Sequence, residues 1–124
     1  MKVQGSIEFT LTERSPEKVT SVMPIQPGIR NPFGGVNAGA MLWFADVTAS
    51  ILILGGAEPY EGMKGFPLAI SLNANFLSNQ KEGSFRAVAS FVKKGTTVSV
   101  VRTVIYGEAE RVIADITTTH VLSG

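Results

Sequence analysis

The chain has 124 residues and a formal net charge of +1, from 10 Asp and Glu against 11 Lys and Arg. This length predicts one domain over residues 1–124. Hydrophobic residues make up 44% and charged residues 17% of the chain, a composition that excludes intrinsic disorder. The near-neutral charge argues against a nucleic-acid partner. The absence of cysteine excludes disulfides, iron–sulfur clusters and thiol catalysis. It also fits the cytoplasmic location that we expect, and the first eight residues contain no apolar stretch of a secretory signal.

The N-terminal part of the chain predicts two strands and a loop. Polar and apolar residues alternate over 6–12, as in a half-buried strand. A second strand is predicted over 18–23 and ends before Pro24. Residues 24–35 contain three prolines and three glycines, which predicts a loop with little regular structure.

Residues 37–54 form the single long helical candidate. Asn37 suits an N-cap, and the Gly-Gly pair that begins at Gly55 is a stop signal. Asp46 is the only ionisable residue in this segment, and apolar side chains occur all round, so we expect a helix buried on every side. A membrane span is the alternative, but a span needs about 20 apolar residues and a central aspartate costs several kcal/mol. We therefore expect no membrane association.

The C-terminal half predicts β-structure. After a loop rich in glycine and proline, residues 68–76 alternate with a period of two. Residues 84–92, 97–106 and 112–122 are rich in Val, Ile, Thr and Phe and are separated by turns, which predicts an antiparallel meander. The fold class is therefore α+β, with two strands, one helix and four more strands, and the sheet wraps around the helix.

Asp46 is the residue that most needs an explanation. Burying an unpaired carboxylate costs several kcal/mol and raises its pKa, and sites where this cost is tolerated are often functional. The structural alternative is that Ser50, one turn later, satisfies the carboxylate, or that Asp46 caps a group across the core.

A second candidate feature lies just before the helix. Residues 31–39 place small side chains at the helix start, where the first N–H groups are open to a ligand oxygen. Such donors can form an oxyanion hole for acyl transfer. An ordinary glycine-rich turn with an N-cap is the alternative.

The positions of these two features predict a dimer. Asn37 and Asp46 are nine residues apart, which is roughly 13 Å along a helix and about 180° around it. One helix cannot bring both to the same small substrate. If both serve one site, two chains contribute to it, and a symmetric dimer with two interface sites follows.

Two segments carry a family resemblance. Asn31-Pro-Phe-Gly-Gly-Val-Asn-Ala-Gly39, followed by Phe44-Ala-Asp46, resembles the hotdog-fold acyl-CoA thioesterases. The closest group contains the phenylacetate-degradation and 4-hydroxybenzoyl-CoA thioesterases, in which Asn, then Gly, then His-Gly-Gly open a central helix and an acidic residue follows nine residues after the His. Weaker matches in the same order occur at 71–77, 81–83, 93–96 and 113–119, so the resemblance covers about residues 3–122.

The resemblance implies a hotdog fold and a site shared between subunits. Hotdog domains wrap an antiparallel sheet around a long helix, dimerise into a continuous sheet and often pair again into tetramers. Carried over by position, Asp46 is the catalytic carboxylate, acting as base or nucleophile. The N–H of Ala38 polarises the thioester carbonyl, and Asn31 holds that carbonyl or the attacking water. The expected reaction is hydrolysis of an acyl-CoA to a carboxylic acid and free coenzyme A.

The remaining expectations concern substrate binding and cofactors. We expect no metal and no redox cofactor, with coenzyme A present only as part of the substrate. The substrate-binding candidates are Gly39, Ser50, Ser71, Lys93 and Lys94. The two lysines suit the phosphates of coenzyme A, and solvated turn residues are the alternative for them.

The chain departs from the family pattern at two positions. Asn37 replaces the family histidine and Ala38 replaces the first glycine. Asn37 can cap a helix and donate a hydrogen bond, but it cannot act as a general base. Ala69 stands where some relatives have Ser or Thr, and the alternation places Ser71 on the same strand face as Ala69.

Other candidates and functions remain open. His120 is the only histidine and has no metal-ligand spacing around it, which favours a structural or exposed role. Trp43 and Phe44 are expected to fill the core or line an acyl pocket. The first alternative function is an acyl-CoA-binding protein that has lost activity. A hydratase or dehydratase is the second, and it is less favoured because His120 is far from the helix in sequence.

Overall fold

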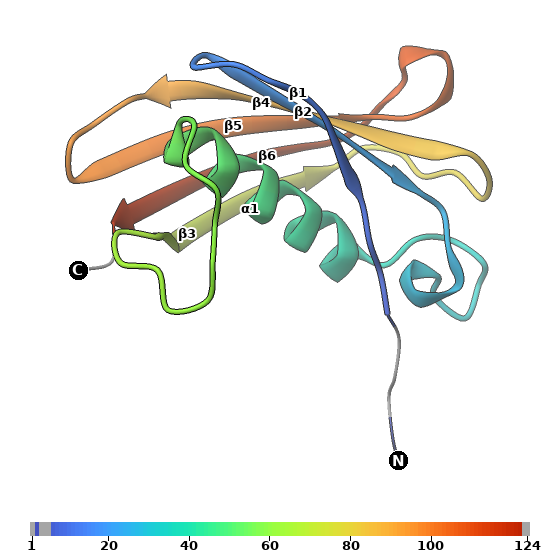
Figure 1. Cartoon of the computed structure of the whole chain (residues 1–124). Helices are drawn as coiled ribbons and strands as arrows, with labels where there is room; N and C mark the ends of the chain where they lie inside the picture. The colour runs from blue at the N-terminus through green and yellow to red at the C-terminus, as the bar shows by residue number, and fades with distance from the viewer. Residues whose placement is uncertain (1, 3–5, 123–124) are drawn as a thin grey trace.

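A curved antiparallel sheet lies over one long helix in the computed structural model, which describes residue 2 and residues 6–122 (Figure 1). The sheet has six strands, and short 3-10 turns precede the helix and the last strand. In chain order the strands and the helix are β1 (Thr10–Arg14), β2 (Lys18–Pro24), α1 (Ala38–Leu54), β3 (Pro67–Phe76), β4 (Ser84–Lys93), β5 (Val98–Tyr106) and β6 (Val112–Leu122). The α+β class predicted from the sequence is confirmed.

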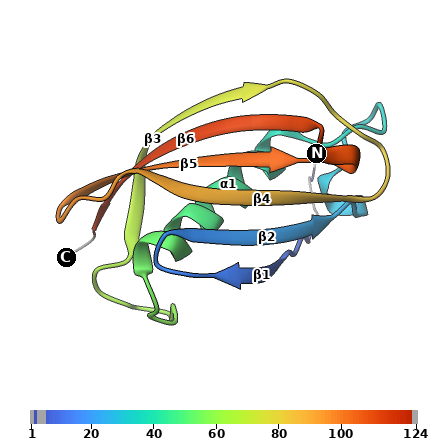
Figure 2. The same cartoon turned by 90° about the horizontal axis from the view of Figure 1, so that it is seen from above.

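The strand order across the sheet is β1-β2-β4-β5-β6-β3, and every neighbouring pair is antiparallel (Figure 2). The meander predicted for the last three strands is confirmed. β3 pairs with β6 instead of with β4, so it forms one outer edge of the sheet. The chain reaches this edge from the end of the helix through the loop 55–66, and the helix lies under the middle of the sheet (Figure 1).

The predicted first strand differs from β1 at both ends. The strand begins at Thr10 and not at Ser6, and it runs on to Arg14. The register that pairs Thr10 with Val22 would set Glu8 against Pro24, which has no N–H to offer. The backbone N–H and carbonyl of Glu8 bond instead to the side-chain amide of Gln26, at 3.1 and 2.9 Å.

The loop predicted over 24–35 contains some regular structure. Residues 27–29 form a 3-10 turn, and an isolated antiparallel bridge joins Arg30 to Val36. This bridge brings the two ends of the segment together immediately before the helix. The loop therefore has a fixed geometry at the point where α1 begins.

The helix has the predicted ends. Asn37 is its N-cap residue, and Gly55 ends it with a φ of 71°, which glycine tolerates best. The concave face of the sheet packs on α1 through two apolar clusters. Phe44 and Phe85, both fully buried, lie in the larger cluster, and Leu52 lies in the smaller one near the end of the helix. No helix in the described part of the chain is long and apolar enough to cross a membrane.

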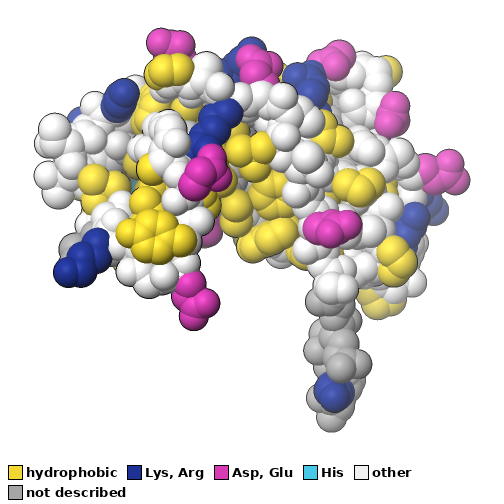
Figure 3. Space-filling view, viewed as in Figure 1, with side chains coloured by type: hydrophobic (Ala, Val, Ile, Leu, Met, Phe, Trp, Pro, Cys, Tyr) yellow, Lys and Arg dark blue, Asp and Glu magenta, His cyan; other side chains and the backbone are white. Residues whose placement is uncertain are grey.

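The expectation that the helix is buried on every side is wrong for the single chain. One sheet covers one face of a helix, and the opposite face has no second layer over it (Figure 1). Trp43 is 38% exposed, and Leu42, Val47 and Leu54 are half-buried. Figure 3 shows hydrophobic side chains gathered over this uncovered side of α1. An apolar side of this kind is a surface that a further layer can cover.

A bulge in β3 overturns the regular alternation predicted for that strand. Ala69 is paired with His120, whereas Ser71 is paired with Thr119, so Ile70 is an extra residue between them. Paired residues share a face, and His120 and Thr119 point to opposite faces of β6. Ser71 therefore lies on the face opposite to Ala69, and the shared face predicted for the two is wrong.

Candidate active site

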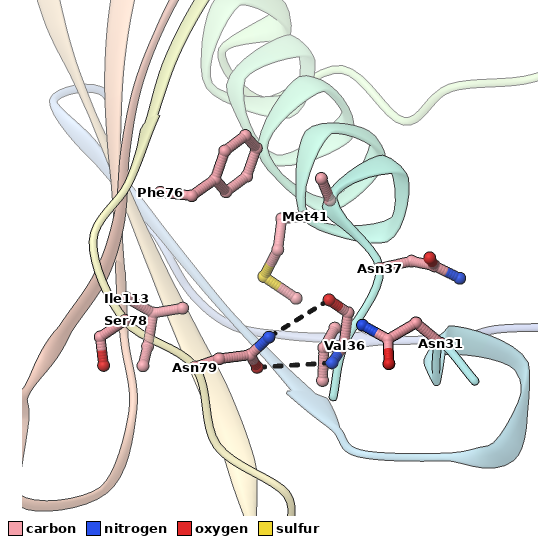
Figure 4. A pocket seen from close by; sticks show the side chains of 9 residues that line it. Asn31, Val36, Asn37, Met41, Phe76, Ser78, Asn79 and Ile113 are labelled. Carbon is pink, nitrogen blue, oxygen red and sulfur yellow. Dashed lines mark hydrogen bonds between the residues drawn. The ribbon is translucent and has the colours of Figure 1, made fainter. Parts of the chain in front are cut away.

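A cavity of about 310 Å³ lies at the start of α1, between the preceding loop and the end of β3 (Figure 4). Its apolar wall comes from the helix, from β3 and from β6, and its polar side comes from asparagines and one serine. The residues that line it are Asn31, Val36, Asn37, Ala38, Met41, Phe76, Ser78, Asn79 and Ile113. Three residues singled out in the sequence, Asn31, Asn37 and Ala38, therefore lie together at one cavity.

Two asparagine side chains hold the loop before the helix. The Asn31 carboxamide oxygen accepts hydrogen bonds from the N–H groups of Phe33 and Gly35, at 2.9 and 3.1 Å. Asn79 bonds both backbone groups of Val36, its oxygen accepting at 3.4 Å and its nitrogen donating at 3.3 Å. Figure 4 shows the Asn79 pair as dashed lines, with Asn31 on the other side of Val36. The Asn31 nitrogen has no partner within the described residues and is open to a ligand.

The first two N–H groups of α1 are free. The N–H groups of Ala40 and Met41 donate to the carbonyl of Asn37, at 3.2 and 3.4 Å. Those of Ala38 and Gly39 have no acceptor among the described residues, and both residues are exposed. The Asn37 side chain does not cap the helix and donates instead to the carbonyl of Arg30 at 3.5 Å. The helix start is therefore a pair of unused donors at the positive end of the helix dipole.

Asp46 sits near the middle of α1 with a half-buried carboxylate. Its Oδ1 atom is buried and has no hydrogen-bond partner, and Ser50 does not bond to it. Burial raises the pKa of the Asp46 carboxyl above the ordinary value of 3.8, and the nearby His120 opposes part of this rise. The structural alternative, in which Ser50 satisfies the carboxylate, is therefore wrong.

The cavity at the helix start does not include Asp46. The helix start and the carboxylate are separated along α1, as the sequence spacing requires. A single chain therefore presents the N–H donors and the carboxylate at two different places.

His120 lies on β6, which packs on α1, and its charge interacts with that of Asp46 on the helix. The imidazole is 1% exposed, and burial lowers its pKa while the Asp46 charge opposes this effect. The two residues are 74 positions apart in the sequence, so no local pattern relates them.

Comparison with known proteins identifies the family of the chain. Residues 33–114 match the family model described as the thioesterase superfamily. The chain belongs to the thioesterase superfamily. It is also 32% identical over 108 residues to "Putative esterase ComA2" of Bacillus subtilis (strain 168), a match that covers 87% of this chain and 83% of that protein.

Solved structures agree on the hotdog fold of this superfamily member. A hypothetical protein of Staphylococcus aureus has a TM-score of 0.85 at 22% identity, with 94% of each chain covered. A thioesterase of Haemophilus influenzae has a TM-score of 0.80 at 21% identity, covering 92% of this chain and 77% of that one. A hypothetical thioesterase of Streptococcus pneumoniae, solved with coenzyme A, has a TM-score of 0.81 at 14% identity, covering 94% and 87%.

The other predicted site residues of this thioesterase-superfamily chain are dispersed. Lys93 and Lys94 lie at the far end of β4, near the cluster that packs on the C-terminal half of α1, and Lys94 Nζ is 5.6 Å from the ring centre of Phe91. Ser50 is 3% exposed, and Ser71 lies on the outer face of the sheet. Within one chain, none of these four residues reaches the cavity at the helix start.

The two aromatic residues of the superfamily helix have different environments. Phe44 is fully buried in the larger apolar cluster, which confirms the core role predicted for it. Trp43 is partly exposed and meets the ring of Phe9 edge-on, with ring centres 5.0 Å apart. Trp43 therefore lies at the uncovered side of α1.

Sequence reasoning missed Asn79 and the apolar wall of the cavity. Asn79 is 43 residues from Val36, and only the loop composition after β3 marks it as a candidate polar contact. Met41, Phe76 and Ile113 come from three different elements and look like ordinary core positions in the sequence.

Proposed function

We propose that the chain is an acyl-CoA thioesterase, which hydrolyses an acyl-CoA to a carboxylic acid and free coenzyme A. The observation that carries this proposal is the half-buried, unpartnered carboxylate of Asp46 on a helix whose first N–H groups are free. Membership of the thioesterase superfamily and the names of the relatives support the reaction class. The cytoplasmic location expected from the sequence is part of the same proposal.

The proposed chemistry needs one carboxylate and the helix donors. Acting as base, Asp46 takes a proton from water, and the water oxygen attacks the thioester carbonyl carbon. The N–H groups of Ala38 and Gly39 hold the resulting oxyanion. The C–S bond then breaks, and the proton on Asp46 passes to the leaving sulfur. Acting as nucleophile, Asp46 instead forms an anhydride as the thiolate leaves, and water hydrolyses that anhydride.

A site of this kind requires two chains. The donors and the carboxylate lie apart in one chain, and the uncovered side of α1 is apolar. β3 is an outer strand that exposes Leu68, Ile70 and Leu72 at 52%, 61% and 47%. An exposed apolar edge strand is a surface for pairing with another chain. We propose a homodimer joined through β3 with the site at its interface, and further pairing into a tetramer.

The substrate class is proposed from the site and the relatives. Met41, Phe76 and Ile113 make the cavity wall apolar, which suits an acyl or pantetheine chain. One relative was solved with coenzyme A. In the dimer, we propose that Lys93 and Lys94 of the partner chain contact the coenzyme A phosphates, and that Asn31, Gly39 and Ser50 lie along the substrate path. The outer-face position of Ser71 does not support the same role for it. We keep the phenylacetate-degradation and 4-hydroxybenzoyl-CoA thioesterase group as the proposed subgroup.

A binding protein without catalysis is the alternative that the sequence leaves open. Asn37 replaces the family histidine, and its side chain is occupied with the Arg30 carbonyl. If the histidine of relatives transfers a proton, this chain binds acyl-CoA and hydrolyses it slowly or not at all.

Hydration of an enoyl-CoA is supported less well. The histidine closest to Asp46 is His120, which is 1% exposed and has Nε2 engaged by Thr118 at 2.7 Å. A ring buried in this way has little access to a substrate.

The experiment that tests the proposal is thiol release from a panel of short, long and aryl acyl-CoAs. Wild type is compared with Asp46→Asn and with the matched control Asp115→Asn, which removes a half-buried carboxylate paired with Arg102. We expect Asp46→Asn to lower kcat by about 100-fold or more, the range of general base catalysis. We expect Asp115→Asn to keep the kcat of the wild type.

Two other results would contradict the proposal. Absence of turnover across the panel, with acyl-CoA still raising the Tm, would identify a binding protein. Conversion of an enoyl-CoA to a hydroxyacyl-CoA without thiol release would identify a hydratase.

A further inference from the structure

The turn before α1 carries the most exposed large apolar side chain of the described residues. Phe33 is 90% exposed, compared with 68% for Tyr60, which is the next in order. The ring does not line the cavity at the helix start, although Asn31, two residues earlier, does. A single exposed apolar residue is ordinary on a protein surface, so its meaning depends on how it is held and on what lies beside it.

The backbone that carries Phe33 is held closed by hydrogen bonds. The N–H group of Asn31 donates to the carbonyl of Gly35 at 2.7 Å, and the Asn31 side chain accepts from the N–H group of Phe33 at 2.9 Å. The bridge between Arg30 and Val36 closes the base of the turn, and Figure 4 shows Asn31 and Val36 together beside the cavity. Phe33 is therefore presented from a fixed backbone, which reduces the cost of ordering it when a ligand binds.

A cation without a carboxylate partner lies on the same turn. Three other arginines form ion pairs with acidic side chains, namely Arg14, Arg86 and Arg102. Arg30 is exposed and forms no ion pair within the described residues, and its Nη1 donates to the carbonyl of Gly34 at 3.1 Å. Because Gly34 directly follows Phe33, this bond brings the guanidinium to the segment that carries the ring. The other guanidinium N–H groups have no partner in the described chain and are open to an anion.

We propose that Phe33 and Arg30 form a subsite for the adenosine phosphate end of coenzyme A. The base stacks on the exposed ring, and the guanidinium binds a phosphate. A ligand of this turn combines an aromatic face with negative charge, and the nucleotide is the part of every acyl-CoA that has both. The apolar cavity remains for the acyl or pantetheine chain. The inference rests on the proposed acyl-CoA substrate, and it adds a phosphate contact to those proposed for Lys93 and Lys94 of the partner chain.

The first test measures binding without turnover. The probes are the S-butyl thioethers of coenzyme A and of pantetheine, which share one arm, differ in the nucleotide and are not substrates for hydrolysis. We expect Phe33→Leu, which keeps an apolar side chain but removes the ring, to raise the Kd of the coenzyme A thioether by about tenfold in isothermal titration calorimetry. The Kd of the pantetheine thioether stays at its wild-type value. Phe33→Trp restores the affinity, and Tyr60→Leu, at another exposed aromatic residue, is the matched control.

The second test addresses the anion. We expect Arg30→Gln to raise the Kd of the coenzyme A thioether by about tenfold, as for the loss of a hydrogen bond between charged groups, and to weaken the dependence of this Kd on salt. Arg30→Lys keeps the charge without the planar fork, so its Kd lies between the two. Arg102→Gln is the matched control, because it removes an exposed arginine that is already paired with Asp115.

The other outcomes of these measurements contradict the inference. An unchanged Kd of the coenzyme A thioether in either Phe33→Leu or Arg30→Gln would overturn the two-residue subsite. An equal loss of affinity for both thioethers would place the two residues against the acyl or pantetheine arm. Dissociation of a dimer by Phe33→Leu, with the affinity for the coenzyme A thioether unchanged, would assign the ring to the interface between chains. If the wild type binds this thioether through both residues but hydrolyses no acyl-CoA, the proposed function fails and the subsite stands.

Discussion

At the residue scale, Asp46 combines a catalytic position with an unfavourable environment. Its carboxylate is half-buried in an apolar helix, and Oδ1 has no partner among the described residues. Positions that carry such a cost are more often kept for chemistry than for stability. Two predictions about this residue follow from the direction of its pKa shift.

The first prediction is that Asp46→Asn stabilises the protein at neutral pH. Because the folded-state pKa is raised, the folded chain binds more protons than the unfolded chain between 3.8 and the raised value. The free energy of unfolding of the wild type therefore falls as pH rises through that window. The Asp46→Asn variant has no charge to bury, so the Tm of the variant exceeds that of the wild type at neutral pH. This difference in Tm disappears below pH 3.8, the ordinary pKa of the carboxyl. Thermal unfolding of both proteins across pH measures this. Equal Tm values at neutral pH would count against the burial of the charge.

The second prediction concerns activity against pH. The proposed base works only when Asp46 is ionised, so kcat/KM rises as pH passes the raised pKa of this carboxyl. The acidic limb of the profile is expected above 3.8, the ordinary carboxyl value. A profile that is flat down to that value would show that a different group limits the reaction.

At the scale of elements, the loop before α1 depends on contacts from distant parts of the chain. Asn79, in the loop after β3, bonds both backbone groups of Val36. Val36 itself is buried, at 6% exposed. Asn31 holds the same loop from the other side. The direction of the first helical N–H groups is therefore set by side chains outside the helix.

The third prediction is that Asn79→Ala loosens the helix start. We expect a loss of about 2 kcal/mol in the free energy of unfolding, because both hydrogen bonds to Val36 are lost and each has a usual net value of roughly 1 kcal/mol. KM for acyl-CoA rises at the same time. Asn75→Ala, at an exposed position of β3, is the matched control and leaves both quantities near wild type. Denaturant unfolding and steady-state kinetics measure the two effects. An unchanged KM in Asn79→Ala would show that Asn79 does not contribute to the substrate site.

The elements themselves were largely predictable from the sequence. The helix ends, β6 and the approximate bounds of β2 to β5 follow from local signals: an N-cap asparagine, a stop glycine and β-branched runs. The start of β1 was not predictable, because it depends on where its partner strand meets Pro24. The bulge at Ile70 breaks a period of two that the residue types alone do not reveal.

The candidate site was predictable only in part. Asn31, Asn37 and Ala38 are close in sequence, and they line one cavity. Asn79 and His120 reach the loop and the helix through strand pairing across long sequence separations. Such contacts are determined by topology, and no local pattern encodes them.

At the scale of the whole molecule, one side of α1 and the outer edge of β3 are apolar and uncovered. The fourth prediction is that Ile70→Lys, at the exposed bulge of β3, converts a dimer into monomers and abolishes turnover. A lysine on an edge strand blocks pairing with a second strand. Val92→Lys is the matched control, because Val92 is 63% exposed on β4, which is paired on both sides. Sedimentation velocity measures the assembly. A wild type that sediments as a monomer would overturn the dimer proposal.

The fifth prediction is that the backbone N–H group of residue 38 can be removed with loss of activity and little loss of stability. Ala38→Pro deletes an N–H group that has no acceptor, at the first helical position, where proline is well tolerated. The preceding residue, Asn37, already has the extended ψ of 135° that a following proline favours. We expect Ala38→Pro to keep the Tm of the wild type and lose most of its activity.

The most direct test of a site shared by two chains is complementation between Ala38→Pro and Asp46→Asn. The two inactive proteins are unfolded together, refolded as a mixture and assayed for thiol release from acyl-CoA. Random pairing makes about half of the dimers mixed, and each mixed dimer has one site with an intact Ala38 and an intact Asp46 from different chains. We therefore predict recovery of about a quarter of the wild-type activity. A mixture that forms mixed dimers and remains inactive would show that donor and carboxylate do not act across the interface, and it would contradict the account.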